Sequence, residues 1–83
     1  MFFVYVLKSE KNNRLYYGST NNLERRIKEH NIGHSKYTKL SRPFRLVYFE
    51  EFETLNEARN RELFFKSGKG RSCIKERLSR AVA

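Results

Sequence analysis

Apolar positions along the chain follow two periods, one typical of strands and the other of helices. Phe2–Leu7 is apolar throughout and rich in β-branched and aromatic residues, so it is predicted to be a buried strand. Arg14–Gly18 and Phe44–Phe52, which Pro43 precedes, are predicted to be the second and third strands. The short polar loop Lys8–Asn13 joins the first two strands, which favours an antiparallel hairpin.

Apolar residues three or four positions apart, preceded by capping residues, predict the helices. The first expected helix follows an Asn21–Glu24 capping box and runs to about Asn31. The second runs from Leu55 to about Ser67, follows a Thr54–Glu57 box and is ended by Gly68. A last helix follows Gly70 and Arg71. The order β-β-α-β-α-α predicts an α+β fold, a three-stranded antiparallel sheet with flanking helices. Residues 1–83 are expected to form a single domain.

The charge balance narrows the class of partner. The chain carries 18 Lys and Arg against nine Glu, with no Asp, for a net charge of +9. This excess indicates a polyanionic partner, which is DNA, RNA or an anionic membrane surface, and it favours nucleic acid. No apolar run approaches the roughly 18–20 residues of a membrane span, so no membrane-spanning segment is expected. The single cysteine, Cys73, can form neither an internal disulfide nor a CxxC zinc site, and it is expected to be a buried thiol in a reducing cytoplasm.

Basic residues gather in two stretches, which supply the candidate nucleic-acid-binding residues. The first stretch holds Lys36, Lys39 and Arg42 around Tyr37, and the second holds Lys66, Lys69, Arg71 and Lys75. The ring of Tyr37 is suited to stack on a base. Ordinary surface charge explains both stretches equally well. Neither stretch has a pattern for reading base edges, so little sequence preference is expected.

Two tyrosines and two helix residues stand out as candidate chemistry. Side chains alternate along a strand, so Tyr16 shares a face with Gly18, which leaves room for a ligand or a backbone to approach. Arg26 and His30 are four residues apart on the first helix, so they lie side by side just after the hairpin. The structural alternatives are that Tyr5 and Tyr16 are core aromatics and that Arg26 and His30 form a solvated helix face.

The second predicted helix carries one charge in the stripe that should face the core. That stripe consists of Leu55, Ala58, Glu62 and Phe65. A buried carboxylate must form an ion pair, take up a proton or bind a metal, and Mg²⁺ fits because one or two carboxylates often hold it while it keeps its waters. The structural alternative for Glu62 is an ion pair with Arg59 or Arg26.

Together these segments resemble the GIY-YIG nuclease superfamily. Val4-Tyr5-Val6 and Tyr16-Tyr17-Gly18, with eleven residues from tyrosine to tyrosine, resemble the motif that names it. Residues 19–30 resemble the family's helix with its catalytic arginine, and Arg59-Asn60-Arg61-Glu62 resembles the helix with its metal-binding glutamate. The resemblance spans Phe3 to about Arg77. It is strongest to small stand-alone proteins related to the N-terminal domain of the UvrC DNA repair nuclease.

This resemblance implies an endonuclease that hydrolyses nucleic-acid phosphodiesters, DNA favoured, with one Mg²⁺ or Mn²⁺ ion. The resemblance implies that Tyr5 or Tyr16 acts as the general base or positions it, that Arg26 stabilises the transition state, and that His30 assists proton transfer. It further implies that Glu62 is the sole protein ligand of the metal and that Gly18 has a structural role. At 83 residues there is no length for the separate DNA-recognition domain of larger relatives, so binding is expected either to be weak or to have its specificity supplied by a protein partner.

The chain also departs from the family pattern. The first motif lacks its glycine, being Phe3-Val4-Tyr5, and Tyr17 replaces the isoleucine of the second. A late asparagine that some relatives use has no match after Glu62. Two alternatives to an active enzyme therefore stay open: a nucleic-acid-binding module with the nuclease fold but little or no catalytic activity, and a protein-interaction domain that meets an acidic partner.

Overall fold

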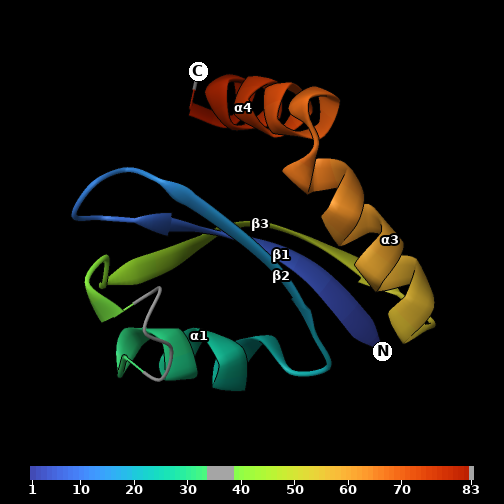
Figure 1. Cartoon of the computed structure of the whole chain (residues 1–83), viewed down its shortest axis with the longest axis horizontal. Coiled ribbons are helices and arrows are strands. Elements are labelled where there is room, and N and C mark those ends of the chain that lie inside the picture. The colour runs from blue at the N-terminus through green and yellow to red at the C-terminus, as the bar shows by residue number, and fades with distance from the viewer. Residues whose placement is uncertain (34–38, 83) are drawn as a thin grey trace.

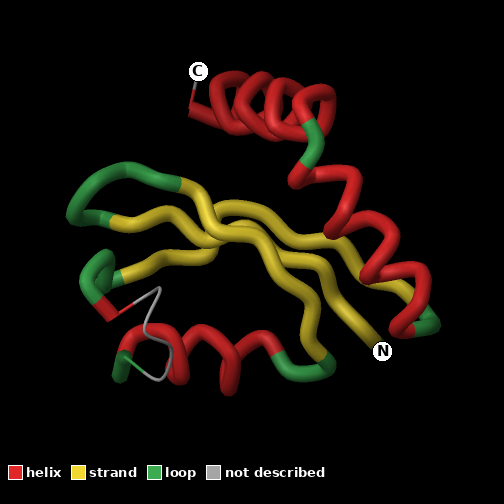
Figure 2. Tube along the Cα trace, in the orientation of Figure 1, coloured by secondary structure: helices red, strands yellow, loops and turns green. Residues whose placement is uncertain are grey.

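A computed structural model describes residues 1–33 and 39–82 of the chain. The sheet consists of β1 (Phe2–Ser9), β2 (Leu15–Thr20) and β3 (Phe44–Phe52). The strands are antiparallel and lie in the order β2-β1-β3, so β1 is central and β2 and β3 are edges (Figures 1 and 2). The hairpin predicted from the polar loop between the first two strands is present.

Helices lie on both faces of the sheet. They are α1 (Leu23–Asn31), α3 (Leu55–Lys66) and α4 (Gly68–Val82). The helix α1 lies on one side of the sheet, and α3 and α4 lie on the other side (Figure 1). The predicted α+β fold and the order β-β-α-β-α-α are confirmed.

Alternation of side chains along β1 divides the core between the two faces of the sheet. The cluster on the side of α3 and α4 is Val4, Val6, Phe65 and Ile74, and the cluster on the side of α1 is Tyr5, Leu7 and Phe44. Leu23 and Ile27 of α1 pack against the second cluster. Each face of β1 therefore has its own helix layer, and Tyr5 belongs to the layer under α1.

One predicted helix cap was placed one residue too early. Asn22, not Asn21, caps α1, because its side-chain oxygen accepts a hydrogen bond from the backbone N–H of Arg25 at 3.0 Å. With Asn22 as the cap, Glu24 is not at the third helical position that a capping box needs. At Thr54–Glu57 the predicted N-cap forms, since the Thr54 hydroxyl accepts a hydrogen bond from the Glu57 backbone N–H at 3.2 Å. The Glu57 carboxylate accepts a hydrogen bond from the Thr54 hydroxyl at 2.9 Å, in place of the backbone N–H that a full capping box would use.

The corner between α3 and α4 also differs from the prediction. The helix α3 ends at Lys66, and Gly68 begins α4 instead of ending a helix. Ser67, with φ −77° and ψ 165°, is the one extended residue between them. A Cβ at Gly70 would overlap the backbone of Phe64. Glycine at that position therefore permits the close approach that folds α4 back beside the sheet.

Polar side chains fasten β3 to the two helices. Arg61 of α3 donates hydrogen bonds to both carboxylate oxygens of Glu50 at 2.8 and 3.3 Å. Arg77 of α4 donates to the phenol of Tyr48 at 3.0 Å, and Tyr48 donates to Glu50 at 2.5 Å. This network holds α3 and α4 in place on the sheet, which in turn positions the residues that they carry.

Two expectations drawn from composition concern single features of the chain. Cys73 was predicted to be buried, but it is half-buried and unpaired with another cysteine. Its place on α4 explains the difference, because the next residue, Ile74, faces the core instead. Across residues 1–33 and 39–82, no helix combines the length and the apolar character needed to cross a membrane.

Candidate functional site

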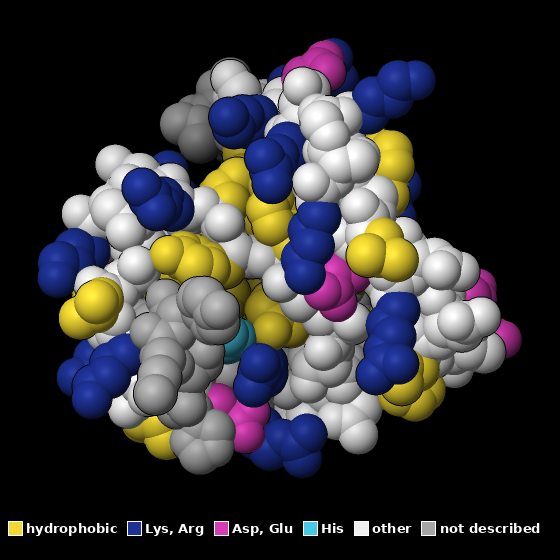
Figure 3. All heavy atoms as spheres, viewed as in Figure 1, with side chains coloured by type: hydrophobic (Ala, Val, Ile, Leu, Met, Phe, Trp, Pro, Cys, Tyr) yellow, Lys and Arg dark blue, Asp and Glu magenta, His cyan; other side chains and the backbone are white. Residues whose placement is uncertain are grey.

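An open cleft runs along the edge strand β2, between α1 and the α3–α4 pair. Its volume is about 1220 Å³, which exceeds the roughly 300–1,000 Å³ of most small-molecule pockets. In the space-filling view, a hollow with hydrophobic side chains at its base is surrounded by Lys and Arg (Figure 3). Tyr16 and Tyr17 both line the cleft although consecutive strand residues point to opposite faces. The cleft therefore straddles the edge of the sheet.

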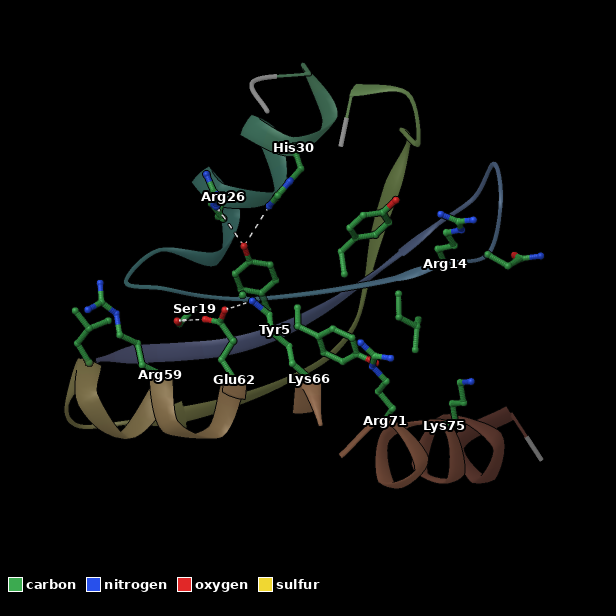
Figure 4. Close-up of a pocket in the computed structure, with 16 residues that line it drawn as sticks. Tyr5, Arg14, Ser19, Arg26, His30, Arg59, Glu62, Lys66, Arg71 and Lys75 are labelled. Carbon is green, nitrogen blue, oxygen red and sulfur yellow. Dashed lines mark hydrogen bonds and ion pairs between the residues drawn. The ribbon is translucent and has the colours of Figure 1, made fainter. Parts of the chain in front are cut away.

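The phenol of Tyr5 is the point where α1 meets this cleft. Its oxygen accepts a hydrogen bond from Nε of Arg26 at 3.2 Å and lies 3.1 Å from Nε2 of His30. Figure 4 shows both side chains reaching from α1 toward the Tyr5 hydroxyl. Tyr5 and His30 are only 3% and 7% exposed, whereas 38% of the Arg26 side chain is exposed. His30 therefore holds the Tyr5 phenol in a buried position, whereas the Arg26 guanidinium faces both the phenol and solvent.

Burial is the main influence on the pKa values of Tyr5 and His30. Burial raises the pKa of the Tyr5 phenol, and the hydrogen bond and charge of Arg26 oppose that rise. Burial lowers the pKa of His30, and the positive charge of Arg26 lowers it further. At neutral pH the phenol is therefore protonated and the imidazole is neutral. Because Arg26 can only donate, the hydrogen of the phenol is free to point at Nε2 of His30 when the ring proton is assigned to Nδ1.

Gly18 allows the ring of Tyr5 to reach the edge of the sheet. The two residues are direct partners across β1 and β2. A Cβ added at Gly18 would lie within 2.5 Å of Cζ of Tyr5, well inside van der Waals contact. The open space that the sequence predicted beside Gly18 therefore exists, but it is filled by the Tyr5 ring and not by a ligand.

Glu62 reaches the cleft from α3, on the side of the sheet opposite to α1. One carboxylate oxygen accepts a hydrogen bond from the Ser19 hydroxyl at 2.5 Å, and the other pairs with Nζ of Lys66 at 2.7 Å. The Glu62 side chain is 19% exposed, so it borders the core without being enclosed in it. The predicted structural partners, Arg59 and Arg26, are both wrong: the ion pair is made with Lys66, one helical turn further along α3.

The cleft offers a metal ion few ligands. Glu62 is the sole carboxylate among its lining residues. Within the described part of the chain, no three His, Cys or Glu side chains come together in a way that would enclose an ion. The donor set fits Mg²⁺, which keeps several waters and is often held by one or two carboxylates and substrate phosphates. Glu62 also acts on the site electrostatically, because its negative charge raises the pKa of Tyr5, although less than burial does.

Tyr16 lines the cleft, but its hydroxyl is engaged elsewhere. It donates a hydrogen bond to the hydroxyl of Ser41 at 2.8 Å, and its ring packs edge-on against Phe44 with 5.1 Å between centroids. Asn12 donates to the same Ser41 hydroxyl at 3.1 Å. Among the described residues, Tyr5 is thus the tyrosine whose phenol meets Arg26, and Tyr16 forms the wall beside it.

The structure separates the candidate nucleic-acid-binding residues into three groups. Those that line the cleft are Lys66, Arg71 and Lys75. Those that do not are Lys39, Arg42 and Lys69, all of which are exposed. Lys36 and Tyr37 lie outside the described residues. Linear clustering thus grouped side chains that the fold directs to different surfaces.

Other residues of the cleft were not assigned a role from the sequence. They include Arg14, Tyr17, Ser19 and Arg59. Helical spacing could have indicated Arg59, because it precedes Glu62 by three positions and shares its face of α3. Arg14 could have been indicated by the strand period, which places it on the same face as Tyr16, and Ser19 by its position directly after Gly18. Neither signal reveals that Ser19 contacts Glu62.

Known proteins are similar to this chain in sequence and in fold. A family model described as the GIY-YIG catalytic domain matches residues 1–76, a range that includes every lining residue. The UPF0213 protein CPE1444 of Clostridium perfringens is 54% identical over 67 residues, which are 80% of this chain and 71% of that protein. The UPF0213 protein YazA of Bacillus subtilis is 48% identical over 65 residues, which are 77% of this chain and 65% of that protein. The solution NMR structure of the UPF0213 protein BH0048 from Bacillus halodurans matches with a TM-score of 0.55 and 34% identity, over 92% of this chain and 84% of that one.

Proposed function

Because the chain belongs to the GIY-YIG family of nuclease catalytic domains, we propose that it is a metal-dependent endonuclease that hydrolyses nucleic-acid phosphodiesters, most readily those of DNA. One observation carries the proposal. Tyr5, in contact with Arg26 and His30, faces the same cleft as the single carboxylate of Glu62. A nucleophile-activating group, a cation for the transition state and a metal ligand are the parts that such hydrolysis needs.

Arg26 is the residue proposed to stabilise the transition state. Its Nε is engaged by Tyr5, and its terminal nitrogens make one long contact, 3.4 Å to Glu29, within the described residues. The remaining N–H groups are available to a phosphate that enters the cleft. A guanidinium that is held in place before the substrate arrives stabilises the charge that develops on the phosphoryl oxygens without further reorganisation.

Tyr5 and His30 are proposed to move the proton of the attacking water. A neutral phenol is a weak base, but it can accept the proton of the water while it passes its own proton to Nε2 of His30, 3.1 Å away. The lowered pKa of His30 keeps the imidazole neutral and ready to accept. Tyr16, whose hydroxyl is bound to Ser41, is proposed to shape the site and not to carry the proton.

Glu62 is proposed to hold one Mg²⁺ or Mn²⁺ ion, with Ser19 orienting the carboxylate through its hydrogen bond. A bound divalent ion supplies Lewis-acid stabilisation of the phosphoryl oxygens. The ammonium of Lys66 now occupies one side of the same carboxylate. When a metal ion displaces Lys66 from Glu62, the ammonium of Lys66 is free to pair with a substrate phosphate.

The ion pair between Glu62 and Lys66 also favours a second candidate function. A carboxylate satisfied by Ser19 and Lys66 has less need of a metal, as in a module that binds nucleic acid with little catalysis. The two functions make different predictions for metal. An endonuclease cuts when Mg²⁺ or Mn²⁺ is added and stops with a chelator, whereas the binding module retains its affinity for DNA under both conditions.

The deciding experiment is a cleavage assay on plasmid and branched DNA with Mg²⁺, Mn²⁺ or a chelator. Arg26→Ala and Glu62→Gln are each expected to lower the rate by about 10²–10³, the usual cost of removing one group aimed at the transition state. The control is Arg80→Gln, which removes a charge that is exposed on α4 and outside the cleft. Cleavage at the unchanged rate in both site variants would falsify the proposed site.

Binding alone separates both of these functions from that of a protein-interaction domain. Contacts to phosphates release counterions, so affinity for DNA should fall steeply between about 50 and 200 mM salt. A chain that binds neither DNA nor RNA at low salt would instead support an acidic protein partner.

A further inference from the structure

The end of the cleft near α4 and the β1–β2 hairpin is distinct from the part beside Tyr5. Its lining includes Arg14 from the hairpin and Arg71 and Lys75 from α4. In Figure 4, Arg71 and Lys75 point from α4 toward the sheet, on the side where Arg14 lies. The lining residues of the whole cleft include a single carboxylate, that of Glu62. This end is therefore strongly cationic.

Tyr17 supplies an aromatic surface in the middle of these cations. It points to the opposite face of β2 from Tyr16, and it lines the cleft while remaining half-buried. The ring of Phe65 supports it from below in a near-parallel arrangement, with 6.4 Å between centroids and 23° between planes. Arg71 is close enough to oppose the rise in the pKa of the Tyr17 phenol that burial causes. A supported aromatic ring beside cations is the arrangement on which unpaired bases stack.

A polymer that occupies both ends of the cleft must cross the open edge of β2. The Tyr5 phenol lies on the α1 face and Tyr17 lies on the α3 face, and β2 pairs on one side only, with β1. A duplex has a persistence length of about 50 nm and resists so sharp a turn. Its paired bases also hide the faces that would stack on Tyr17. A single strand bends freely and presents its bases.

We propose that this end of the cleft is a subsite for an unpaired nucleotide next to the scissile phosphate, with the base on Tyr17 and the backbone held by Arg14, Arg71 and Lys75. The proposal rests on the proposed function, because Tyr5 and Arg26 define where the scissile phosphate lies. The preferred substrate class is then a single strand or a duplex with a single-stranded extension.

Binding tests this subsite without cleavage. The Glu62→Gln protein is titrated, with a chelator present, into three labelled DNA probes, and binding is followed by fluorescence anisotropy. The probes are a single strand, the blunt duplex of the same sequence, and that duplex with a single-stranded extension. The single strand and the extended duplex are expected to bind roughly tenfold more tightly than the blunt duplex, in line with one base–aromatic stack. Equal affinity for all three probes would overturn the proposal.

Variants of the subsite make the test specific. Tyr17→Leu, which keeps apolar contact with Phe65, should remove most of the preference for the single strand and leave blunt-duplex affinity unchanged. Tyr17→Phe should keep the preference because the ring remains. Lys75→Gln should weaken single-strand binding more than Lys69→Gln, which changes the net charge equally but lies outside the cleft. Equal losses in the two lysine variants would contradict the subsite even if Tyr17→Leu failed to fold.

The outcomes of this experiment and of the cleavage assay can be told apart. A protein that prefers unpaired DNA in the predicted way but cuts nothing with Mg²⁺ or Mn²⁺ supports the subsite and refutes the endonuclease. A protein that cuts, but binds blunt duplex and single strand equally, supports the endonuclease and refutes the subsite.

Discussion

The phenol of Tyr5 lies directly over Gly18, in the space that a side chain at position 18 would fill. The contact joins the two halves of the tyrosine–glycine motif, since one residue comes from each strand of the hairpin. Without a side chain at Gly18, the buried ring extends to the edge of the sheet, where its oxygen meets Arg26 and faces the cleft.

Gly18→Ala is therefore expected to displace Tyr5 and reduce activity. Overpacking a buried contact costs about 1–3 kcal/mol, and roughly 1 kcal/mol shifts Tm by about 4–8 °C in a domain of this size. Calorimetry would measure the loss of stability, and the cleavage assay the fall in kcat/KM. Gly68→Ala is the matched control, because nothing lies within 4 Å of the added Cβ, and it should leave both quantities nearly unchanged. Equal Tm values for the two variants would contradict the steric explanation.

The two tyrosines should differ in their contribution to catalysis. Tyr5→Phe removes the hydroxyl that contacts Arg26 and His30, and it should lower kcat by about 10²–10⁴, the usual range for a positioned acid–base group. Tyr16→Phe removes a hydrogen bond to Ser41 and should cost about 1 kcal/mol of stability with a much smaller effect on kcat. Single-turnover cleavage and urea unfolding of both variants check this, and a larger kcat loss in Tyr16→Phe would reverse the assignment.

Lys66 is expected to compete with a metal ion for Glu62. Its ammonium lies 2.7 Å from the carboxylate, with half of the lysine side chain exposed. Exposed pairs of this kind are worth up to about 1 kcal/mol, so Lys66→Met should tighten Mn²⁺ binding by up to roughly fivefold. Isothermal titration of Mn²⁺ into the DNA-free protein measures this directly. Lys69→Met, which lies outside the cleft, is the control, and weaker Mn²⁺ binding by Lys66→Met would show that the lysine does not compete.

His30 should make stability depend on pH on the acid side of neutrality. Its folded pKa is lowered below the ordinary value of 6.5 by burial and by Arg26. Between the two values the unfolded chain binds a proton that the folded chain does not, so the free energy of unfolding falls as pH decreases through 6.5 toward the folded pKa. Urea unfolding of the natural protein and of His30→Gln across this range tests it. The substitution should flatten this part of the profile, and an identical slope in both proteins would exclude His30 as its source.

Much of the fold followed from local patterns. The apolar run of β1 was recognised because a strand that packs on both faces needs apolar residues throughout. The strand β3 was recognised from its Val, Tyr and Phe residues, which favour strands. The Thr54–Glu57 box predicted the start of α3, since capping depends on residues close in sequence. The cap of α1 was misplaced because Asn21 and Asn22 are equally suited by type, and the backbone geometry at Asn22 alone selects it.

The site required more than local patterns. Helical spacing placed Arg26 beside His30, but their meeting at the Tyr5 oxygen depends on how α1 packs against the sheet. The same spacing placed Glu62 in an inward stripe, yet it turned out to border the cleft and to pair with Ser19, which is 43 positions away. No periodicity relates residues so distant in the chain.

The sequence by itself determined the elements, their order and the residue types that hydrolysis would need, because secondary structure and side-chain chemistry depend on neighbours along the chain. Only the tertiary structure decided that α1 and α3 approach β2 from opposite faces, so that the cleft wraps the strand's open edge and gathers Arg14, Tyr17 and Ser19 beside the motif residues. The reason is that distances between helices on opposite faces of a sheet follow from how both layers pack against it. That packing is a property of the whole core and not of any one segment.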